Sequence, residues 1–558
     1  MRTFDYVIVG AGLTGITVGN KLSQKGFSTL IIEAGPDPRW NHRVYNAEDR
    51  VQHDPYCNWL YPAYDEDGSL LPGNIDSGAC IGGGTSSRWT DFRSDMMRKE
   101  YLLTTLWLVN GLMWFRPTQT EVDKLEELGN PGWNWDSLEP YMKAAERNTP
   151  PDPVQRSQGA GRDPEVHGYS GPINVSFPIP MRIPRAVELY KESLPSIFPG
   201  LTIGNDLSNR SLDGTVSASS SWTIWHDYDT GENRRSSAAD GYLWASSQQR
   251  ESLTVLTNHK VDKVLFSEDL TASGVIFGTK PGADVPGSQS GLHAVRANKE
   301  VILAAGSLAT APVLERSGIG SSDVLAAAGI QQLVDLPGVG VNLVDQPGTG
   351  TSALVAEAYQ NDTSLIDGRI LFAPEISLVN VEQIWGAVPV AEFIGESYPT
   401  VLSAIFWPLV PLSRGHVHIN SSNAFNNPII TPRFLSDAFD RDVAVTISRR
   451  SRTLFASEPF SEVVADPFYD PPIGPNGTDS EWLAWYKSTG AGASHWVGST
   501  AMLPRDLGGV VDFKLQVYGT KNLRVVDAGI LPFEITSHPM PLLYAVAQKA
   551  AALILEGN

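Results

Sequence analysis

A glycine-rich turn between two apolar runs near the N-terminus constrains the fold more than any other feature of this sequence. Residues 6–9 and 29–32 are continuous apolar runs, typical of strands buried in a parallel sheet. Residues 13–24 have a helical pattern, and Lys25-Gly26 after them is a typical helix end. This order predicts one βαβ unit.

The turn itself fits the dinucleotide-binding pattern G-x-G-x-x-G with Gly10, Gly12 and Gly15. Such glycines permit a tight turn, a close approach of the backbone to a pyrophosphate, and close packing of helix on strand. Glu33 ends the second strand, 18 residues after Gly15, where a carboxylate binds a ribose hydroxyl. We therefore predict a dinucleotide site. The pattern does not separate FAD from NAD, and a plain glycine turn beside a surface Glu is the simpler alternative.

The composition excludes several kinds of partner and site. The chain of 558 residues has a formal net charge of −20, so its surface repels nucleic acid and we expect no nucleic-acid partner. The most apolar window, residues 102–115, is too short for a membrane span of about 20 residues. Cys57 and Cys80 are the only cysteines, so no cysteine-based metal site is expected. They can form one disulfide or remain two free thiols.

The sequence carries only weak signals for a compartment. No signal peptide precedes the first strand, so we expect the chain as given in the cytoplasm, or secreted if an upstream signal is missing. Sequons for N-glycosylation would fit secretion, although chance also produces a few in a chain of this length. They begin at Asn174, Asn209, Asn361, Asn420 and Asn476.

Further along the chain, turn-rich stretches separate regular elements. Residues 149–164 are rich in Pro, Gly and charge, which predicts an exposed connection where the chain changes domain. Residues 253–256 and 261–265 are predicted to form a strand pair. Residues 301–306 predict a buried strand ending in Gly, and residues 541–555 an apolar, Ala-rich helix.

Five more motifs follow one another in a specific order. They are residues 80–87 (CIGGGTSS), 306–320 (GSLATAPVLERSGIG), 336–346 (LPGVGVNLVDQ), 495–498 (HWVG) with 526–528 (VDA), and 538–540 (HPM). With the N-terminal turn, they resemble the glucose–methanol–choline (GMC) oxidoreductase family, whose members are FAD enzymes. Within that family the likeness is strongest to fungal glucose oxidases and their dehydrogenase and aryl-alcohol oxidase relatives, which residues 132–135 (GWNW) support.

The resemblance implies the fold class and the domain organisation. It implies an α/β, Rossmann-like FAD-binding domain assembled from separated segments, and an α+β substrate-binding domain with an antiparallel sheet. On this chain the FAD-binding domain is expected at residues 1–148, 230–345 and 505–558. The substrate-binding domain is expected at residues 149–229 and 346–504.

The resemblance also implies the chemistry, which is oxidation of an alcohol. A base removes the hydroxyl proton while a hydride passes to flavin N5, and oxygen or a quinone-like acceptor then takes the electrons. His495 matches the base, a role that suits a neutral imidazole near pH 7. His538 matches the partner that binds the substrate oxygen. The residues implied to contact FAD are Gly10, Gly12, Gly15, Glu33, Gly83, Gly84, Ser86, Asn110, Gly111, Asp527 and Ala528.

Each of these residues also has a purely structural interpretation. The two histidines can be hydrogen-bonded residues of the core. Asp527 can be the acid of a turn or a helix cap. A functional role is expected for the helix over residues 541–555. Its N-terminus should point at the flavin's pyrimidine end, where the helix dipole favours an anion.

The sequence departs from the family pattern at the second glycine-rich loop. There Ser87 and Asn110-Gly111, close together in the family, are separated by the atypical insertion 88–109. A retained intron is one explanation. If the protein carries the insertion, the loop against the flavin is disrupted, and a protein inactivated in this way is one alternative function.

A second departure concerns the substrate. Glucose-oxidising relatives have Arg four residues before the base, whereas this chain has Ala491 in a Gly/Ala-rich segment. We therefore expect an apolar, aryl or secondary-metabolite alcohol at least as readily as a sugar. A non-redox lyase or cyclase that keeps FAD as a structural group is a further alternative.

Overall fold

The computed structural model describes most of the chain, and everything below refers to those residues. They are residues 2–47, 57–86, 112–181, 185–197, 202–203, 206–208, 215–217, 221–245, 250–281, 291–359, 371–372, 390–397, 401–474 and 476–557.

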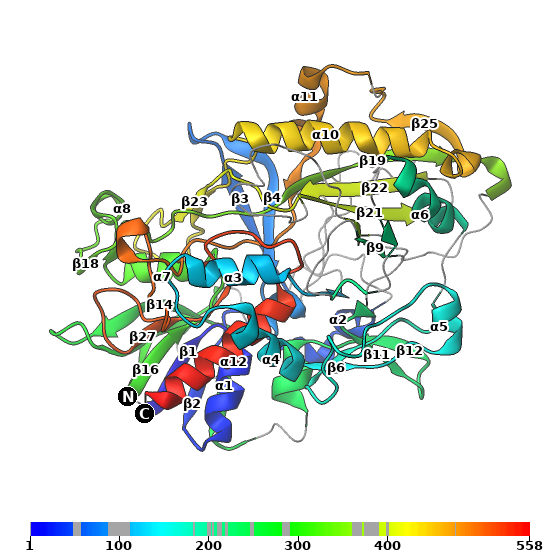
Figure 1. The fold of residues 1–558 in the computed structure, drawn as a ribbon. Coiled ribbons are helices and arrows are strands. Elements are labelled where there is room, and N and C mark those ends of the chain that lie inside the picture. The colour runs from blue at the N-terminus through cyan, green and yellow to red at the C-terminus, as the bar shows by residue number, and fades with distance from the viewer. Residues whose placement is uncertain are drawn as a thin grey trace.

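A mixed seven-stranded sheet with a parallel core forms the lower half of the molecule in Figure 1. Its parallel strands lie in the order β13 (Leu253–Leu256), β2 (Thr29–Ile32), β1 (Thr3–Val9) and β16 (Leu292–Leu303), and β27 (Leu523–Val525) pairs with the far edge of β16. Every one of these pairs is parallel, and the central strands are apolar and buried. The predicted strands at 6–9 and 29–32 are confirmed within these elements, whereas the strand predicted at 301–306 ends earlier, because β16 stops at Leu303 and residues 304–306 form the turn after it.

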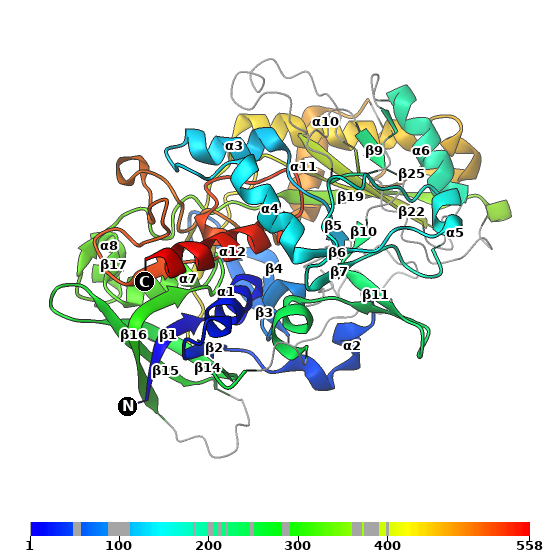
Figure 2. The same ribbon diagram turned by 60° about the horizontal axis from the view of Figure 1, so that its bottom comes forward.

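Helices cover one face of this sheet. Helix α1 (Leu13–Gln24) has the predicted bounds, and α12 (Met540–Glu556) contains the predicted helix 541–555. The two pack side by side, with α4 (Trp135–Ala145) on the outer side of α12 (Figures 1 and 2). The apolar residues of sheet and helices merge into one core, so the N-terminal turn and the start of α12 are held in a rigid frame.

The predicted pairing of residues 253–256 with 261–265 is wrong. The first segment, β13, pairs in parallel with the edge of β2. The second belongs to β14 (His259–Phe266), which pairs instead with β15 (Ala272–Thr279). Strand β15 then continues onto the first half of β16. The two segments separate because β2 offers a free parallel edge to one and β15 offers a hairpin partner to the other.

An antiparallel sheet occupies the upper half of Figure 1. Its order is β21 (Ala391–Ser397), β22 (Val401–Pro408), β19 (Pro347–Val355) and β25 (Val464–Asp470), with β26 (Ala491–Gly492) on the first residues of β19. Helices α10 (Ala438–Phe455) and α6 (Arg185–Ile197) pack on it and close a second core. Helix α11 (Asp479–Thr489) leads into β26.

A third, smaller sheet connects segments that are far apart in sequence. The hairpin β3 (Asn58–Tyr64) and β4 (Leu70–Gly78) joins β24 (Ile429–Thr431) and β23 (His416–His418). It links segments assigned above to different domains, and the domain boundaries themselves stay a prediction. The other elements are α2 (His42–Tyr45), β5 (Met113–Trp114), α3 (Gln119–Glu127), β6 (Glu146–Asn148), α5 (Pro153–Ser157), β7 (Ile173–Val175), β8 (Thr202–Ile203), β9 (Thr215–Ser217), β10 (Ser221–Trp222), β11 (Ile224–Asp227), β12 (Glu232–Arg235), α7 (Thr310–Arg316), β17 (Ile319–Gly320), α8 (Ser322–Ala327), β18 (Val334–Asp335) and β20 (Leu371–Phe372).

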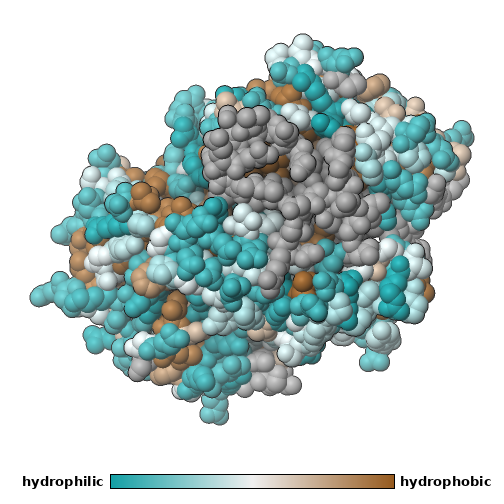
Figure 3. Space-filling model, in the orientation of Figure 1, coloured by the Kyte–Doolittle hydropathy of each residue, from teal (hydrophilic) through white to brown (hydrophobic). Residues whose placement is uncertain are grey.

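Three further observations bear on the sequence analysis. Cys57 and Cys80 are both buried, and their two thiols form no disulfide with each other. Over the described ranges, no helix combines the length and apolarity that a membrane crossing requires. Hydrophilic residues dominate the described part of the face in Figure 3, and its apolar patches are small and separated.

Candidate active site

The N-terminal glycine turn is shaped by contacts with its own backbone and with the end of β16. Gly10 has φ +104°, and a Cβ there would lie 2.4 Å from the carbonyl oxygen of Ala304. A Cβ on Gly15 would lie 2.1 Å from the carbonyl oxygen of Gly10. Gly12, at the start of α1, has only one atom within 4 Å of the same position, at 3.9 Å, and it borders a large cavity. The helix N-terminus therefore meets open space that suits a phosphate.

These contacts predict different effects for two glycine substitutions. Gly15→Ala should destabilise the apoprotein, because its Cβ meets backbone. Gly12→Ala should leave the melting temperature of the apoprotein within about 2 °C but weaken FAD binding by roughly tenfold, since the methyl group enters space that a pyrophosphate needs. Thermal melts of apoprotein and FAD titration by flavin fluorescence check both. Equal loss of apoprotein stability in the two variants would contradict the assignment.

Glu33 lies at the end of β2, buried at the border of the cavity. One carboxylate oxygen accepts the N–H of Ala11 at 2.6 Å and the other accepts the N–H of Gly35 at 2.8 Å. Burial raises the pKa of Glu33, while these two N–H groups oppose the rise. The carboxylate thus braces the glycine turn, and its predicted contact with a ribose hydroxyl stays a prediction.

The second glycine-rich loop packs directly against the first. The N–H of Gly82 donates to the carbonyl of Ala11 at 2.7 Å. Gly83 has φ +52°, and a Cβ there would lie 2.9 Å from Gly12 Cα. Gly83 and Gly84 border the cavity, and their contact with FAD stays a prediction, whereas Ser86 is fully buried beneath Gly82 and is not among the residues that line it. Asn110, Gly111 and the insertion 88–109 lie outside the described residues, so their roles stay predictions.

Asp527 and Ala528 reach the cavity from the C-terminal part of the chain. One oxygen of Asp527 accepts from the N–H of Gly306 at 3.0 Å and from Thr310 Oγ1 at 2.6 Å, and the other accepts from the N–H of Gly529 at 2.9 Å. Asp527 is therefore a cap of a short 3-10 helix and also a tie to the turn after β16. Burial raises its pKa against the effect of these donors. A contact with the flavin's ribityl–phosphate chain stays a prediction.

One cavity connects these segments with the two histidines. Its lining includes Gly10, Gly12 and Glu33 as well as His495, His538 and the first residue of α12. The cavity thus begins at a phosphate-type helix N-terminus and ends at titratable side chains.

His495 and His538 lie side by side at that end. Their ring centroids are 4.8 Å apart, and the rings are inclined at 51°. His495 follows β26, and His538 precedes α12, so two distant parts of the chain meet here. Burial, and then the neighbouring His538, lower the pKa of His495 well below its usual 6.5. His495 is therefore neutral at physiological pH.

The side chain of Gln346 determines which nitrogen of His495 carries the proton. Its Nε2 donates to the carbonyls of Leu409 at 2.8 Å and Ile535 at 3.0 Å, and carbonyls only accept. Its Oε1, 2.7 Å from His495 Nδ1, must therefore be an acceptor. The proton of the neutral ring thus sits on Nδ1, and Nε2 keeps its lone pair.

Asp345 holds the backbone on which His495 sits. Its carboxylate accepts the N–H groups of His495 and Ser494, both at 2.9 Å, and that of Gln346 at 2.8 Å. Ser494 has φ +63°, a conformation that a non-glycine residue keeps only under such restraint. A Cβ on Gly492 would lie 2.1 Å from an oxygen of Asp345, so the Gly/Ala-rich segment allows the carboxylate to approach.

His538 has both a polar and an aromatic neighbour. Its Nε2 is 3.3 Å from Oε1 of Glu392, a fully buried residue of β21. The Phe115 ring lies 5.1 Å from the His538 ring, and Trp407 of β22 lies 6.2 Å from His538 and 6.5 Å from His495. The histidine pair is thus positioned by the antiparallel sheet as well as by the segments that line the cavity.

Phe115 and Trp407 belong to a buried set that we call the apolar cluster. Ala491 of β26 packs against this cluster. It is the position at which glucose-oxidising relatives have Arg. The cluster consists of Ala47, Leu112, Met113, Phe115, Leu207, Ile224, Ile394, Ile405, Trp407 and Leu409.

Comparison with known proteins identifies the family. The chain matches GMC oxidoreductase family models over residues 104–348 and 411–547, and an NAD(P)-binding Rossmann-like model over residues 8–67. It is 31% identical to the glucose oxidase-like protein fsoC of Humicola fuscoatra, over 99% of this chain and 95% of that protein. The chain belongs to the GMC oxidoreductase family.

Two further GMC relatives extend the comparison. A glucose oxidase of Penicillium chrysogenum is 30% identical over 100% of this chain and 92% of its own. The structure of an FAD-dependent oxidoreductase from Chaetomium thermophilum superposes with a TM-score of 0.81 at 25% identity, over 99% of both chains. The resemblance predicted from the motifs, the Rossmann-type FAD fold with its added sheet, and FAD as the cofactor are thereby confirmed.

FAD fits the residues that this GMC oxidoreductase presents. The N-terminus of α1 faces the cavity at Gly12, where a phosphate can approach, and Glu33 borders the same cavity. Gly83 and Gly84 offer backbone without side chains along the same wall. Across the described ranges, no three His, Cys, Asp or Glu side chains come together in a way that could hold a metal ion.

Several residues of this site were not singled out from the sequence as functional. Gln346 stood within a motif, but its side-chain role depends on carbonyls 63 and 189 residues away. Glu392, Phe115 and Trp407 carried no motif. Only Glu392 had a sequence signal, because it is an acidic residue within the otherwise apolar run 391–394.

Proposed function

We propose that this GMC oxidoreductase oxidises the CH–OH group of an apolar, aryl-type alcohol, with His495 as the base. The observation that carries the proposal is the neutral His495, with its proton on Nδ1 and its lone pair on Nε2, beside His538 at the end of the FAD cavity. A base must be unprotonated at working pH and must direct its lone pair at the proton it removes.

The chain's own residues perform the proton chemistry. FAD, when bound, would supply the acceptor for the hydride. Nε2 of His495 takes the hydroxyl proton, and Nδ1–H stays bonded to Gln346 while the ring becomes positive. His538, held by Glu392, binds the substrate oxygen and stabilises its developing charge. The first turn of α12 presents its positive dipole to the cavity, which favours an anion there.

The surroundings of the histidine pair support an apolar substrate. Phe115 and Trp407 are the aromatic neighbours of His538, and Ala491 adds no hydrogen-bond donor. A sugar needs donors and acceptors for several hydroxyls, and neither Phe115 nor Ala491 supplies one. The rings of Phe115 and Trp407 are better suited to an aromatic alcohol beside His538.

Anaerobic mixing with alcohols tests this proposal. Benzylic alcohols should bleach the flavin absorbance, with a kcat/KM at least about tenfold above that for glucose. The reason is that the apolar cluster suits an aromatic ring and offers little to the hydroxyls of a sugar. Readmitted air should restore the yellow colour with stoichiometric hydrogen peroxide if oxygen is the acceptor, as the oxidase names of relatives suggest. A kcat/KM for glucose above that for benzylic alcohols would refute the apolar-substrate proposal.

The variant Ala491→Arg provides the matched control for that measurement. A guanidinium at this position should lower kcat/KM for benzylic alcohols, since it places a charge against the apolar cluster. An equal response of glucose and benzylic alcohols would show that Ala491 does not face the substrate.

A further inference from the structure

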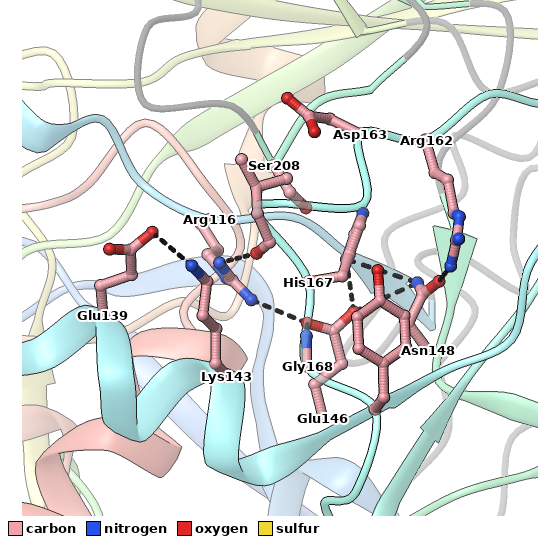
Figure 4. Close-up of polar contacts among 12 residues, drawn as sticks. Arg116, Glu139, Lys143, Glu146, Asn148, Arg162, Asp163, His167, Gly168 and Ser208 are labelled. Atoms are coloured by element: carbon pink, nitrogen blue, oxygen red, sulfur yellow. Dashed lines mark hydrogen bonds and ion pairs between the residues drawn. The ribbon is translucent and has the colours of Figure 1, made fainter.

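A buried group of charges lies next to the apolar cluster and plays no part in the chemistry above. It consists of Arg116, Glu146, His167 and Asp206, which we call the ion cluster. The side chains of Arg116 and Glu146 are 0% exposed, that of His167 is 2% exposed, and that of Asp206 is 11% exposed. Figure 4 shows Arg116, Glu146 and His167 converging from separate segments of the chain. The residues thus tie together parts of the chain that are distant in sequence.

The four side chains form an alternating row of charges. Oε2 of Glu146 accepts from Arg116 Nη2 at 2.8 Å, and Oε1 lies 2.6 Å from His167 Nδ1. His167 Nε2 lies 2.8 Å from Asp206 Oδ2. Both ring nitrogens therefore face carboxylate oxygens, so the imidazole donates from both and is positively charged. Two positive and two negative groups balance within the row, which allows it to be buried.

Each end of the row is joined to a residue of the apolar cluster. Arg116 directly follows Phe115, whose ring is the neighbour of His538. Asp206 directly precedes Leu207, which is buried in the same apolar cluster. Asp206 also accepts the N–H of Asp163 at 2.7 Å and that of Ser208 at 2.8 Å, so its short segment is held on both sides of Leu207.

We propose that the ion cluster is a positioning device for substrate specificity, which fixes Phe115, the ring neighbour of His538, and Leu207, a member of the same buried apolar cluster. The inference rests on the proposed function, because it assigns the apolar cluster to the substrate. Ion pairs with defined geometry hold their partners at one distance and angle, whereas apolar contacts tolerate sliding. The cluster acts through Phe115 and Leu207 and does not touch the reacting atoms.

The charge state of His167 gives this device a defined pH range. Burial alone would lower the pKa of His167, but the hydrogen bonds to Asp206 and Glu146 raise it to about 9. Burial also opposes ionisation of Asp206, but His167 holds the pKa of Asp206 below its usual value. The nearby charged groups are Arg116, Arg162 on Asn148, Asp163, and the pair Lys143–Glu139.

The directions of the pKa shifts of His167 and Asp206 determine the pH range in which the ion cluster keeps its charges. The contribution of His167 to stability is complete below its unfolded pKa of about 6.5 and is lost as pH rises through about 9. The contribution of Asp206 is complete above its unfolded pKa of about 3.9 and is lost as pH falls through its lower folded value. Binding of an apolar alcohol should therefore be constant around neutral pH and weaken above about pH 9.

The variant Asp206→Asn tests the proposal, because it keeps the shape and removes one charge. Anaerobic flavin reduction by benzyl alcohol should need an about tenfold higher half-saturating concentration, with a limiting rate within about twofold of wild type and unchanged FAD content. The alkaline weakening of binding should move to lower pH, because only Glu146 then raises the pKa of His167. His418→Gln is the matched control, since His418 pairs at 2.6 Å with the buried Glu315 away from the apolar cluster. This control should leave half-saturation unchanged.

A mutant cycle and hydrogen exchange distinguish positioning from general stability. Leu207→Ala should raise half-saturation alone, and the double variant with Asp206→Asn should show little further rise. Asp206→Asn should also speed amide exchange in peptides that contain residues 112–116 and 206–208 but not in α12. If no alcohol reduces the wild-type flavin, the proposed function fails while the exchange result still decides the positioning. Unchanged half-saturation in Asp206→Asn, or additive effects in the double variant, would overturn the inference.

Discussion

Replacement of His495 by alanine is expected to leave FAD bound and to slow reduction of the flavin by an alcohol at least about 100-fold. Removal of a positioned general base costs roughly 10² to 10⁴ in rate. FAD should be retained, because the residues that shape its cavity near Gly12 and Glu33 lie at the opposite end from His495. Stopped-flow absorbance under anaerobic conditions measures the rate, and the flavin-to-protein absorbance ratio measures retention.

The depressed pKa of His495 adds a pH signature to the same experiment. Because protonation destroys the base, wild-type flavin reduction should slow only at a pH well below 6.5, the usual histidine value. His495→Ala should lack that acid limb. His226→Ala, at a partly exposed histidine of β11, is the control and should behave as wild type. Wild-type reduction rates in His495→Ala would remove His495 from the mechanism.

The elements around the N-terminal glycine turn, together with α12, were largely predictable from local sequence. The bounds of α1 and β2, and the presence of β1 and α12, were found because apolar periodicity and glycine signals act within a few residues of each other. The turn at Gly10 to Gly15 forces its own conformation, since a Cβ at either glycine would meet backbone. Motif order then extended this local evidence to the family.

Pairing and side-chain roles were less accessible, because they depend on segments that are distant in sequence. Residues 253–256 form a strand as predicted, yet the partner is β2, more than 200 residues earlier. Asp527 shows a different limit, since it caps a 3-10 helix and lines the cofactor cavity at once. The cap and the cofactor contact were treated as competing interpretations, and one carboxylate has enough acceptor sites for both.

The same limit applies to the residues around the histidine pair. His495 and His538 were predicted from short motifs, but the groups that determine their protonation and orientation come from β21 and from the residue directly before β19. Only the folded chain brings Gln346 between two carbonyls and the imidazole. For this reason the sequence indicated a base, whereas the structure indicates which nitrogen acts.

Replacement of Gln346 by leucine is expected to slow flavin reduction by roughly 100-fold while His495 itself remains, since a misdirected histidine loses most of the value of a base. In the wild type, the amide holds the proton of His495 on Nδ1. Leucine has a similar size but no acceptor, so the proton is free to move to Nε2, the nitrogen that must take the substrate proton. Two carbonyls, of Leu409 and Ile535, lose their donor as well, which should lower the melting temperature.

A loss of stability alone does not explain such a result, so the decisive measurement is the tautomer. Nitrogen-15 NMR of histidine-labelled protein, assigned with His495→Asn, should show wild-type His495 protonated at Nδ1 and Gln346→Leu with protonation at Nε2. Gln346→Asn is the graded control, because its shorter amide keeps the chemistry but cannot span the same three partners. Because His495 is buried beside His538, the ring stays neutral in each variant and only the site of the proton changes. An unchanged Nδ1 tautomer in Gln346→Leu would show that another group fixes the base, and the assignment of that role to Gln346 would fall.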